Sequence, residues 1–138
     1  IMQTHMIFWP VLMQILLILL MYMLLGYRKA KAVKTGNVNL KATALDNKAW
    51  PPEVVKVSNN IDNQFEIPMV FFVLCLLFFG IGQVDLLVLS LAWAFVISRY
   101  AHAYVHIGSN YVPLRMRIFA FGCLVLLTMA FVAAWKLM

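Results

Sequence analysis

Charged side chains are scarce in this sequence: they make up 12% of the 138 residues, and only five of them are acidic. Hydrophobic side chains make up 64%, and the mean hydropathy is +0.90. A water-soluble domain of this length carries many more charges on its surface. The composition therefore excludes an ordinary soluble protein and predicts an integral membrane protein in contact with membrane lipids.

Cysteines and familiar catalytic motifs are also few. The two cysteines, Cys75 and Cys123, lie inside apolar runs, where a thiol behaves as a small hydrophobic group. There is no serine-hydrolase motif and no phosphate-binding loop. His102 and His106 are four residues apart, but the His-Glu-x-x-His pattern of a helical zinc site is missing. We therefore expect no metal site.

The hydrophobic residues that are present fall into four runs, enough for four crossings of a bilayer. We expect spans at residues 8–27, from the polar residues before Pro68 to about 82, at about 86–105, and from 114 or 115 to about 135. The first run has no basic start and no small-residue cleavage site after it, which favours a retained helix over a signal peptide. Residues 1–138 are thus expected to form one all-α domain, a bundle of four transmembrane helices.

The positive charges gather in two of the connections between these runs. The long connection at 28–56 is rich in lysine and arginine, and Arg115 and Arg117 follow the turn before the last span. The positive-inside rule places both connections in the cytoplasm and both termini on the non-cytoplasmic side. A formal charge of +6 would suggest nucleic acid in a soluble protein, but here it indicates topology, so no nucleic-acid partner is expected.

A cluster of amides and carboxylates at residues 57–68 leads directly into the second apolar run. Pro68 at its end is expected to kink the helix. The cluster is either a solvated helix end or one wall of a pocket in the bundle. Ionisable groups at membrane depth are costly and usually functional, which favours the pocket. At about 100° per residue, four of these side chains share one side of a helix: Asn59, Asp62, Asn63 and Glu66.

The expected topology brings a second polar group to the same depth. Arg99, His102 and His106 are spaced by three and four residues, so they lie on one face of the third span. A buried ion needs a partner, and we expect Glu66 to pair with Arg99. The alternative is a structural ion-pair network that only fixes helix packing.

Arg115 and Arg117, at the start of the fourth span, are expected to join this group. Three arginines beside hydrogen-bonding amides predict a cationic pocket that opens beside lipid. Such a pocket suits an anionic, carboxylate-bearing cosubstrate that meets a lipophilic molecule delivered from the bilayer.

Two motifs resemble the MAPEG family, the membrane-associated proteins of eicosanoid and glutathione metabolism. The first is Asn63-Gln-Phe-Glu66-Ile-Pro68, which is similar to the family's Asn-x-x-Glu followed by proline on the second helix. The second motif resembles the family's Arg-x-x-His-x-x-x-Tyr-x-Gly and Pro-x-Arg pattern. It reads Arg99-x-x-His102-x-x-x-His106-x-Gly108 and then Pro113-Leu-Arg115. With the four spans, the resemblance covers nearly the whole chain.

The resemblance implies a homotrimer with glutathione bound between neighbouring subunits in a cytoplasm-facing pocket. Asn63 and Glu66 would then contact glutathione, Arg99 would support the polar network, and Arg115 would be the catalytic group that stabilises the thiolate. His102, His106 and Arg117 are the further candidates for contact with glutathione. The implied reaction is conjugation of the thiol to a lipophilic electrophile or reduction of a lipid hydroperoxide.

The sequence departs from the family pattern at three positions. His106 replaces a tyrosine, Asn59 stands where glutathione-using members often have an arginine, and Met116 replaces a serine of some members. Lys56 and Arg117 are candidates to replace the missing arginine.

The spacing Asn60-x-x-Asn63-x-x-Glu66-x-Pro68 resembles the bacterial branch of the family, which predicts a protein of the bacterial inner membrane. Two other functions stay open beside the enzyme: non-enzymatic binding of lipids or other hydrophobic ligands, and a role as accessory subunit of a membrane complex.

Overall fold

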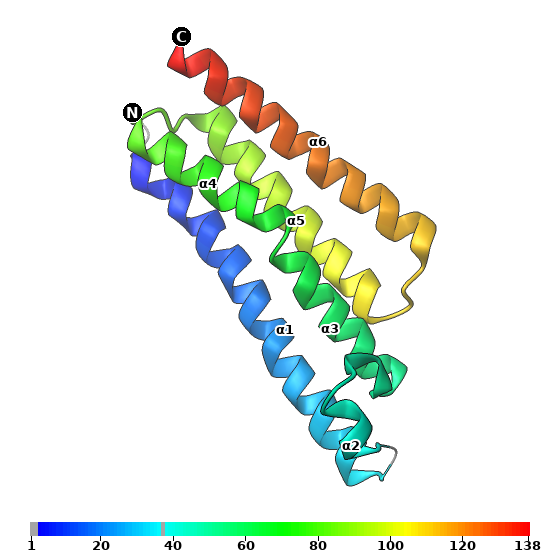
Figure 1. Cartoon of the computed structure of the whole chain (residues 1–138). Coiled ribbons are helices and arrows are strands. Elements are labelled where there is room, and N and C mark those ends of the chain that lie inside the picture. Colours follow the sequence, from blue (N-terminus) through cyan, green and yellow to red (C-terminus); the bar gives the residue numbers. More distant parts are fainter. Residues whose placement is uncertain (1–2, 37) are drawn as a thin grey trace.

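The computed structural model describes residues 3–36 and 38–138, and all regular structure in this part of the chain is helical (Figure 1). Four helical segments are long and apolar enough to cross a membrane: Thr4–Lys34, Pro52–Gly80, Leu86–Ile107 and Val112–Leu137. The predicted bundle of four transmembrane helices is confirmed. The second segment, however, consists of two helices rather than one.

The first segment starts with a short 3-10 helix, η1 (Thr4–Ile7), and continues as α1 (Phe8–Lys34). Helix α1 has 27 residues, so it is about 40 Å long and projects well beyond its charge-free part. It ends at Lys34, and Gly36 follows the capping residue Thr35 with a φ of +76°, in the left-handed region that glycine adopts without strain. The connection then holds two short elements, α2 (Leu40–Thr43) and η2 (Asn47–Ala49).

The second segment is divided into α3 (Pro52–Gln64) and α4 (Ile67–Gly80) by a break at Phe65 and Glu66. Pro68 explains the break, because proline has no N–H to donate to the carbonyl of Gln64 and its ring crowds that turn. The N–H groups of Phe65 and Glu66 instead bond three residues back, at 3.1 and 3.2 Å. Proline was expected to kink this helix, and the structure places the interruption two residues before it.

Helices α5 (Leu86–Ile107) and α6 (Val112–Leu137) form a hairpin. Asp85 caps α5 by accepting a hydrogen bond from the N–H of Val88 at 2.9 Å. The turn to α6 passes through Asn110, whose φ is +52°. Helix α6 begins at Val112, slightly earlier than expected, because proline is well tolerated in a first helical turn and Pro113 does not delay it.

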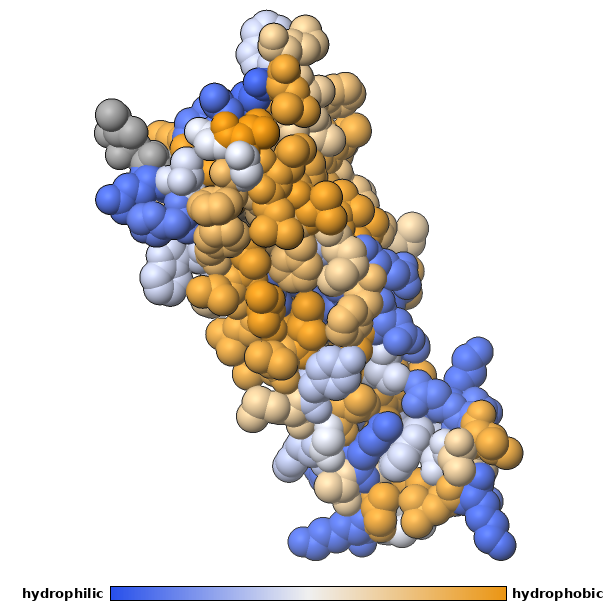
Figure 2. All heavy atoms as spheres, turned by 60° about the vertical axis from the view of Figure 1, so that its left-hand side comes forward, coloured by the Kyte–Doolittle hydropathy of each residue, from blue (hydrophilic) through white to orange (hydrophobic). Residues whose placement is uncertain are grey.

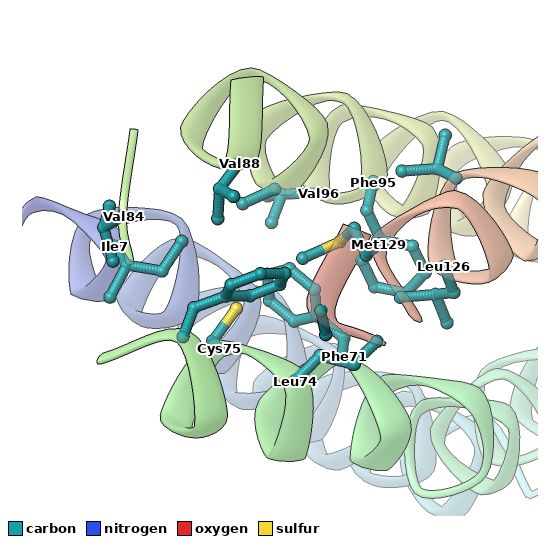
Figure 3. Packing of buried hydrophobic residues seen from close by; sticks show 14 residues of the cluster. Ile7, Phe71, Leu74, Cys75, Val84, Val88, Phe95, Val96, Leu126 and Met129 are labelled. Atoms are coloured by element: carbon teal, nitrogen blue, oxygen red, sulfur yellow. The ribbon is translucent and has the colours of Figure 1, made fainter. Parts of the chain in front are cut away.

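The four segments pack unevenly around each other. Helix α6 contacts α5 and α4, but it does not contact α1 or α3. Near the chain termini, a core of apolar side chains joins α4, α5, α6 and the start of the first segment (Figure 3). Toward the long connection, a smaller apolar cluster joins only α1, α3 and α5. It consists of Leu17, Met21, Val57, Ile61 and Ala103.

Both ends of the chain lie at one end of the bundle, and α2 lies at the other (Figure 1). Figure 2 shows a hydrophobic surface along most of the bundle, with hydrophilic residues at the lower end around the long connection, at the upper end, and in a smaller group midway along one side. The arrangement agrees with two termini on the same side of a membrane. That this side is the non-cytoplasmic one stays a prediction from the positive charges.

Candidate functional site

A pocket of about 210 Å³ opens between α3, α5 and α6, in the half of the bundle where α6 has only α5 as a neighbour. Its lining consists of Asn63, His102, His106, Arg115, Met116 and Phe119. The pocket thus contains Arg115, one of the two arginines of the second sequence motif, with both histidines of that motif and the asparagine of the first. No acidic side chain lines it.

Helix phase explains why α5 supplies two of these groups. His102 and His106 follow Arg99 on one side of α5, and all three side chains are buried, with exposed fractions of 2 to 6%. The two imidazole rings meet edge to face, with centroids 5.5 Å apart. The predicted polar face of the third span is therefore present, and it points into the bundle rather than toward lipid.

Arg115 is positioned by the turn that precedes its own helix. Its Nη1 donates a hydrogen bond to Oδ1 of Asn110 at 3.1 Å. Asn110 adopts the left-handed conformation there, which asparagine tolerates better than most residues. The guanidinium is thereby held at the pocket by a neutral partner, so its positive charge remains available to a ligand.

Arg99 lies behind the pocket and donates from Nη2 to Oδ1 of Asn63. Glu66 is exposed and makes no ion pair, so the expected pairing of Glu66 with Arg99 is wrong for the described part of the chain, where the single ion pair joins Lys136 to Asp85. The cause is the helix break, because Glu66 lies in the interruption and not on the inner face of α3. Contact of Glu66 with glutathione stays a prediction.

The prediction that Asn59, Asp62, Asn63 and Glu66 share the inner side of one helix is also wrong in part. Asn59 and Asp62 are exposed, whereas the buried polar side chains of this helix are Asn60 and Gln64, and Asn63 is partly buried at the pocket. The sequence indicates the correct segment, but the inner face of α3 is rotated by about one residue, about 100°, from the predicted face. The apolar residues Val57 and Ile61 turn inward toward α1 and α5 and set this phase.

A chain of buried amides leads to His106, and neither sequence motif predicts it. Gln14 on α1 donates to Oε1 of Gln64 at 2.7 Å, and Gln64 donates to Oδ1 of Asn60 at 3.1 Å. Nδ2 of Asn60 lies 3.2 Å from Nδ1 of His106. A signal was available in the sequence, because Gln14 is the one amide within the charge-free run at 8–27, and polar groups at membrane depth are usually paired.

Arg117 does not line the pocket. It lies two residues after Arg115, about 200° further around the helix, and borders a different, apolar groove between α5 and α6. Of the predicted site residues, the structure thus gathers Asn63, Arg99, His102, His106 and Arg115, and it leaves Glu66 and Arg117 outside this group. Within residues 3–36 and 38–138, no group of three or more His, Cys, Asp or Glu side chains could hold a metal ion.

The geometry suits an anionic ligand. Arg115 supplies a positive charge with several N–H donors, Asn63 supplies an amide, and the absence of acids from the lining leaves that charge uncompensated. Met116 and Phe119 form an apolar side of the same pocket. An anionic group and an apolar group can therefore meet there.

In a comparison with known protein families, the model of the MAPEG family matches residues 6–135. The chain belongs to the MAPEG family. No curated protein and no solved structure gives a significant match. In this MAPEG protein, the two sequence motifs lie together in space. Asn63 from the first motif and His102, His106 and Arg115 from the second line one pocket.

Proposed function

We propose that this MAPEG protein is a glutathione-dependent membrane enzyme that acts on lipophilic electrophiles or lipid hydroperoxides. One observation carries the proposal: Arg115 is held beside Asn63, His102 and His106 in a pocket without acidic residues. The family includes glutathione transferases and peroxidases as well as non-enzymatic members.

The residues of the pocket fit the thiol end of glutathione. Arg115 favours the thiolate over the thiol, because a nearby cation lowers the pKa of a cysteine thiol. Asn63 offers an amide to the peptide, and Arg99 holds that amide by donating to its oxygen. Met116 and Phe119 give the lipophilic partner an apolar surface next to the sulfur.

In conjugation, the glutathione sulfur would form a bond to a carbon of the electrophile while the bond from that carbon to its leaving group breaks, and the leaving group and the thiol proton would pass into water. In the reduction, two glutathione molecules would supply two electrons and two protons to a hydroperoxide, and the products would be an alcohol, water and glutathione disulfide. The task of this chain is to bind and orient the two partners and to stabilise negative charge on sulfur.

The pocket of about 210 Å³ is small for a whole tripeptide, since ligand pockets usually measure roughly 300–1,000 Å³. We therefore propose that a neighbouring copy completes it in a homotrimer, an assembly that is common in the family. The pocket lies in the half of the bundle nearer the basic connection, which supports a cytoplasm-facing site in a bacterial inner membrane.

Turnover with a generic aromatic electrophile tests the role of Arg115. In the detergent-solubilised protein with glutathione, Arg115→Ala is expected to lower kcat/KM by about 100-fold, as does the loss of other charge-stabilising donors. Arg115→Lys keeps the positive charge but lacks the planar set of guanidinium donors, so its kcat/KM should lie between that of the wild type and that of Arg115→Ala.

Arg117→Ala is the matched control, because it removes the same group from the same helix but outside the pocket. It should retain most of the activity. Equal turnover in wild type and Arg115→Ala, with both proteins folded, would rule out the role proposed for Arg115.

A second candidate, non-enzymatic binding of a lipid or another hydrophobic ligand, is favoured by the groove between α5 and α6. This groove has a volume of about 480 Å³ and is bordered by Ala94, Ile97, Ser98, Ala101, Arg117, Ile118 and Phe121. Lipid that copurifies with the protein, together with no dependence of any activity on glutathione, would support this second function instead.

A further inference from the structure

The amide chain from α1 to the pocket has a direction. Each of its members uses an N–H as donor toward the next: Gln14 to Gln64, Gln64 to Asn60, and Asn60 to His106. The amide nitrogen of Asn60 can only donate, so Nδ1 of His106 must accept and carries no proton. The proton of the neutral ring is then on Nε2.

The end of the chain at Gln14 supports this direction. In this arrangement, Oε1 of Gln14 is the one buried side-chain nitrogen or oxygen atom among the three amides that has no hydrogen-bond partner. If all three amides were turned around, His106 would donate from Nδ1, and the NH₂ group of Gln14 would take the unpartnered place. Buried donors are left without partners more rarely than buried carbonyl oxygens, so the observed direction is the favourable one.

Nε2 of His106 is open toward the pocket. No hydrogen bond within the described part of the chain involves this atom, and it is not one of the buried unpartnered nitrogen and oxygen atoms, which are Gln14 Oε1, Arg99 Nε and His102 Nδ1. His106 is also a lining residue of the pocket. A proton on Nε2 is therefore presented to whatever binds there.

Packing alone does not require such a chain. Gln14, Asn60 and Gln64 are all 0% exposed within membrane-spanning segments, where an apolar residue of similar size would pack without any need for partners. The chain ends on a histidine of the pocket, and the described arrangement gives that histidine a single defined tautomer.

We infer that Gln14, Gln64 and Asn60 are positioning residues that hold His106 as a hydrogen-bond donor, through Nε2–H, toward an anionic atom in the pocket. With Arg115, the pocket then offers two donors to one ligand atom and discriminates against ligands that bring only a donor. The identity of that atom as a thiolate sulfur rests on the proposed function, whereas the tautomer does not.

Nitrogen NMR of the ligand-free protein tests the inference directly. The protein is labelled with ¹⁵N-histidine in detergent, and the signals of His106 are assigned as those lost in His106→Gln. Protonated and unprotonated ring nitrogens have well-separated shifts. We expect an unprotonated Nδ1 and a protonated Nε2 in the wild type at neutral pH. A proton on Nδ1 would overturn the inference, even if no variant folds.

Asn60→Asp supplies the matching perturbation. A carboxylate accepts rather than donates, so Nδ1 should become protonated and the shift of that nitrogen should move to the protonated range. Asn59→Asp is the control, because it adds the same charge one residue away on the exposed side of α3 and should leave the spectrum unchanged. An unprotonated Nδ1 in folded Asn60→Asp, at a pH where the new carboxyl is ionised, would also overturn the inference.

The spectrum requires neither glutathione nor turnover, so its failure is distinct from failure of the proposed enzyme. If the protein is a glutathione-dependent enzyme but His106 has the opposite tautomer, only the inference about the tautomer fails. The expected tautomer without glutathione binding would leave the inference standing for another anionic ligand.

Discussion

The two halves of this bundle share α1, α5 and α6, but one is completed by α4 and the other by α3, and their interiors differ in polarity. Around α4, the interior is apolar and closed, with Phe71 stacked on Phe95 at a centroid distance of 4.7 Å (Figure 3). Around α3, the interior holds Arg99, two histidines and a chain of amides, and it opens into a pocket. The first half is filled with apolar side chains, and the second holds the pocket that we propose as the binding site.

The break at Phe65 and Glu66 marks the border between the halves. On the α4 side, α6 packs against both α4 and α5, and on the α3 side it packs against α5 alone. The space left between α3 and α6 is the pocket. The same proline that ends the continuous helix therefore accompanies the change from a filled interior to an open one.

The largest expected effect comes from opening the apolar half. Phe71→Ala removes a side chain that is 0% exposed and leaves Phe95 without its stacking partner. We expect a loss of about 3 kcal/mol in the free energy of unfolding, because cavities of this size are costly even where lipid replaces water as the solvent. Denaturation in mixed micelles measures it.

Val70→Ala is the control for this prediction, since Val70 is 48% exposed on the same helix and its loss should cost under about 0.5 kcal/mol. Because Phe71 does not line the pocket, folded Phe71→Ala should bind glutathione as well as the wild type does. Equal destabilisation by both variants would show that the interior around α4 is not the main source of stability.

A smaller effect is expected from Asp85 at the closed end. The ion pair with Lys136, at 2.7 Å, and the hydrogen bond from the N–H of Val88 lower the pKa of Asp85 from its usual 3.8. A lowered pKa stabilises the fold above pH 3.8, and this stabilisation is lost as the pH falls through the folded-state pKa. Because Asp85 is 49% exposed, the pair is worth about 1 kcal/mol or less.

Asp85→Asn separates the two contributions, since asparagine caps a helix as well as aspartate but cannot pair with a lysine. Thermal unfolding should show a small loss at pH 7 and no further loss from this site near pH 3. If the variant and the wild type lose stability equally between pH 7 and pH 3, then the ion pair does not contribute.

The sequence predicts the four spans well because the apolar runs are long and nearly free of charge. It also predicts that Asn63, Arg99 and Arg115 belong together, on spacing and on family resemblance. The hydrogen-bond partners of the residues in this group could not be predicted from spacing or resemblance. Which of Asn59 or Asn60 points inward depends on the phase of α3, and Val57 and Ile61 fix that phase through packing that the polar pattern does not reveal.

Glu66 illustrates the same difficulty. A helix that continued through residue 66 would carry its carboxylate on the face of Asn63, which is why pairing with Arg99 was expected. Pro68 breaks the helix at Phe65 and Glu66, so the side chain of Glu66 does not point to the same face as Asn63. The amide chain from Gln14 joins residues 50 and 46 positions apart in sequence, and local patterns carry no signal for such pairs.

Calorimetric titration of glutathione into the detergent-solubilised protein tests whether the pocket beside Arg115 binds this ligand. We expect binding at millimolar ligand or below. Binding should be weakened about tenfold or more in Arg115→Ala and little changed in Arg117→Ala, because a hydrogen bond to a charged group is worth roughly 1.5–3 kcal/mol. Folded wild-type protein that shows no binding at millimolar glutathione would contradict this expectation.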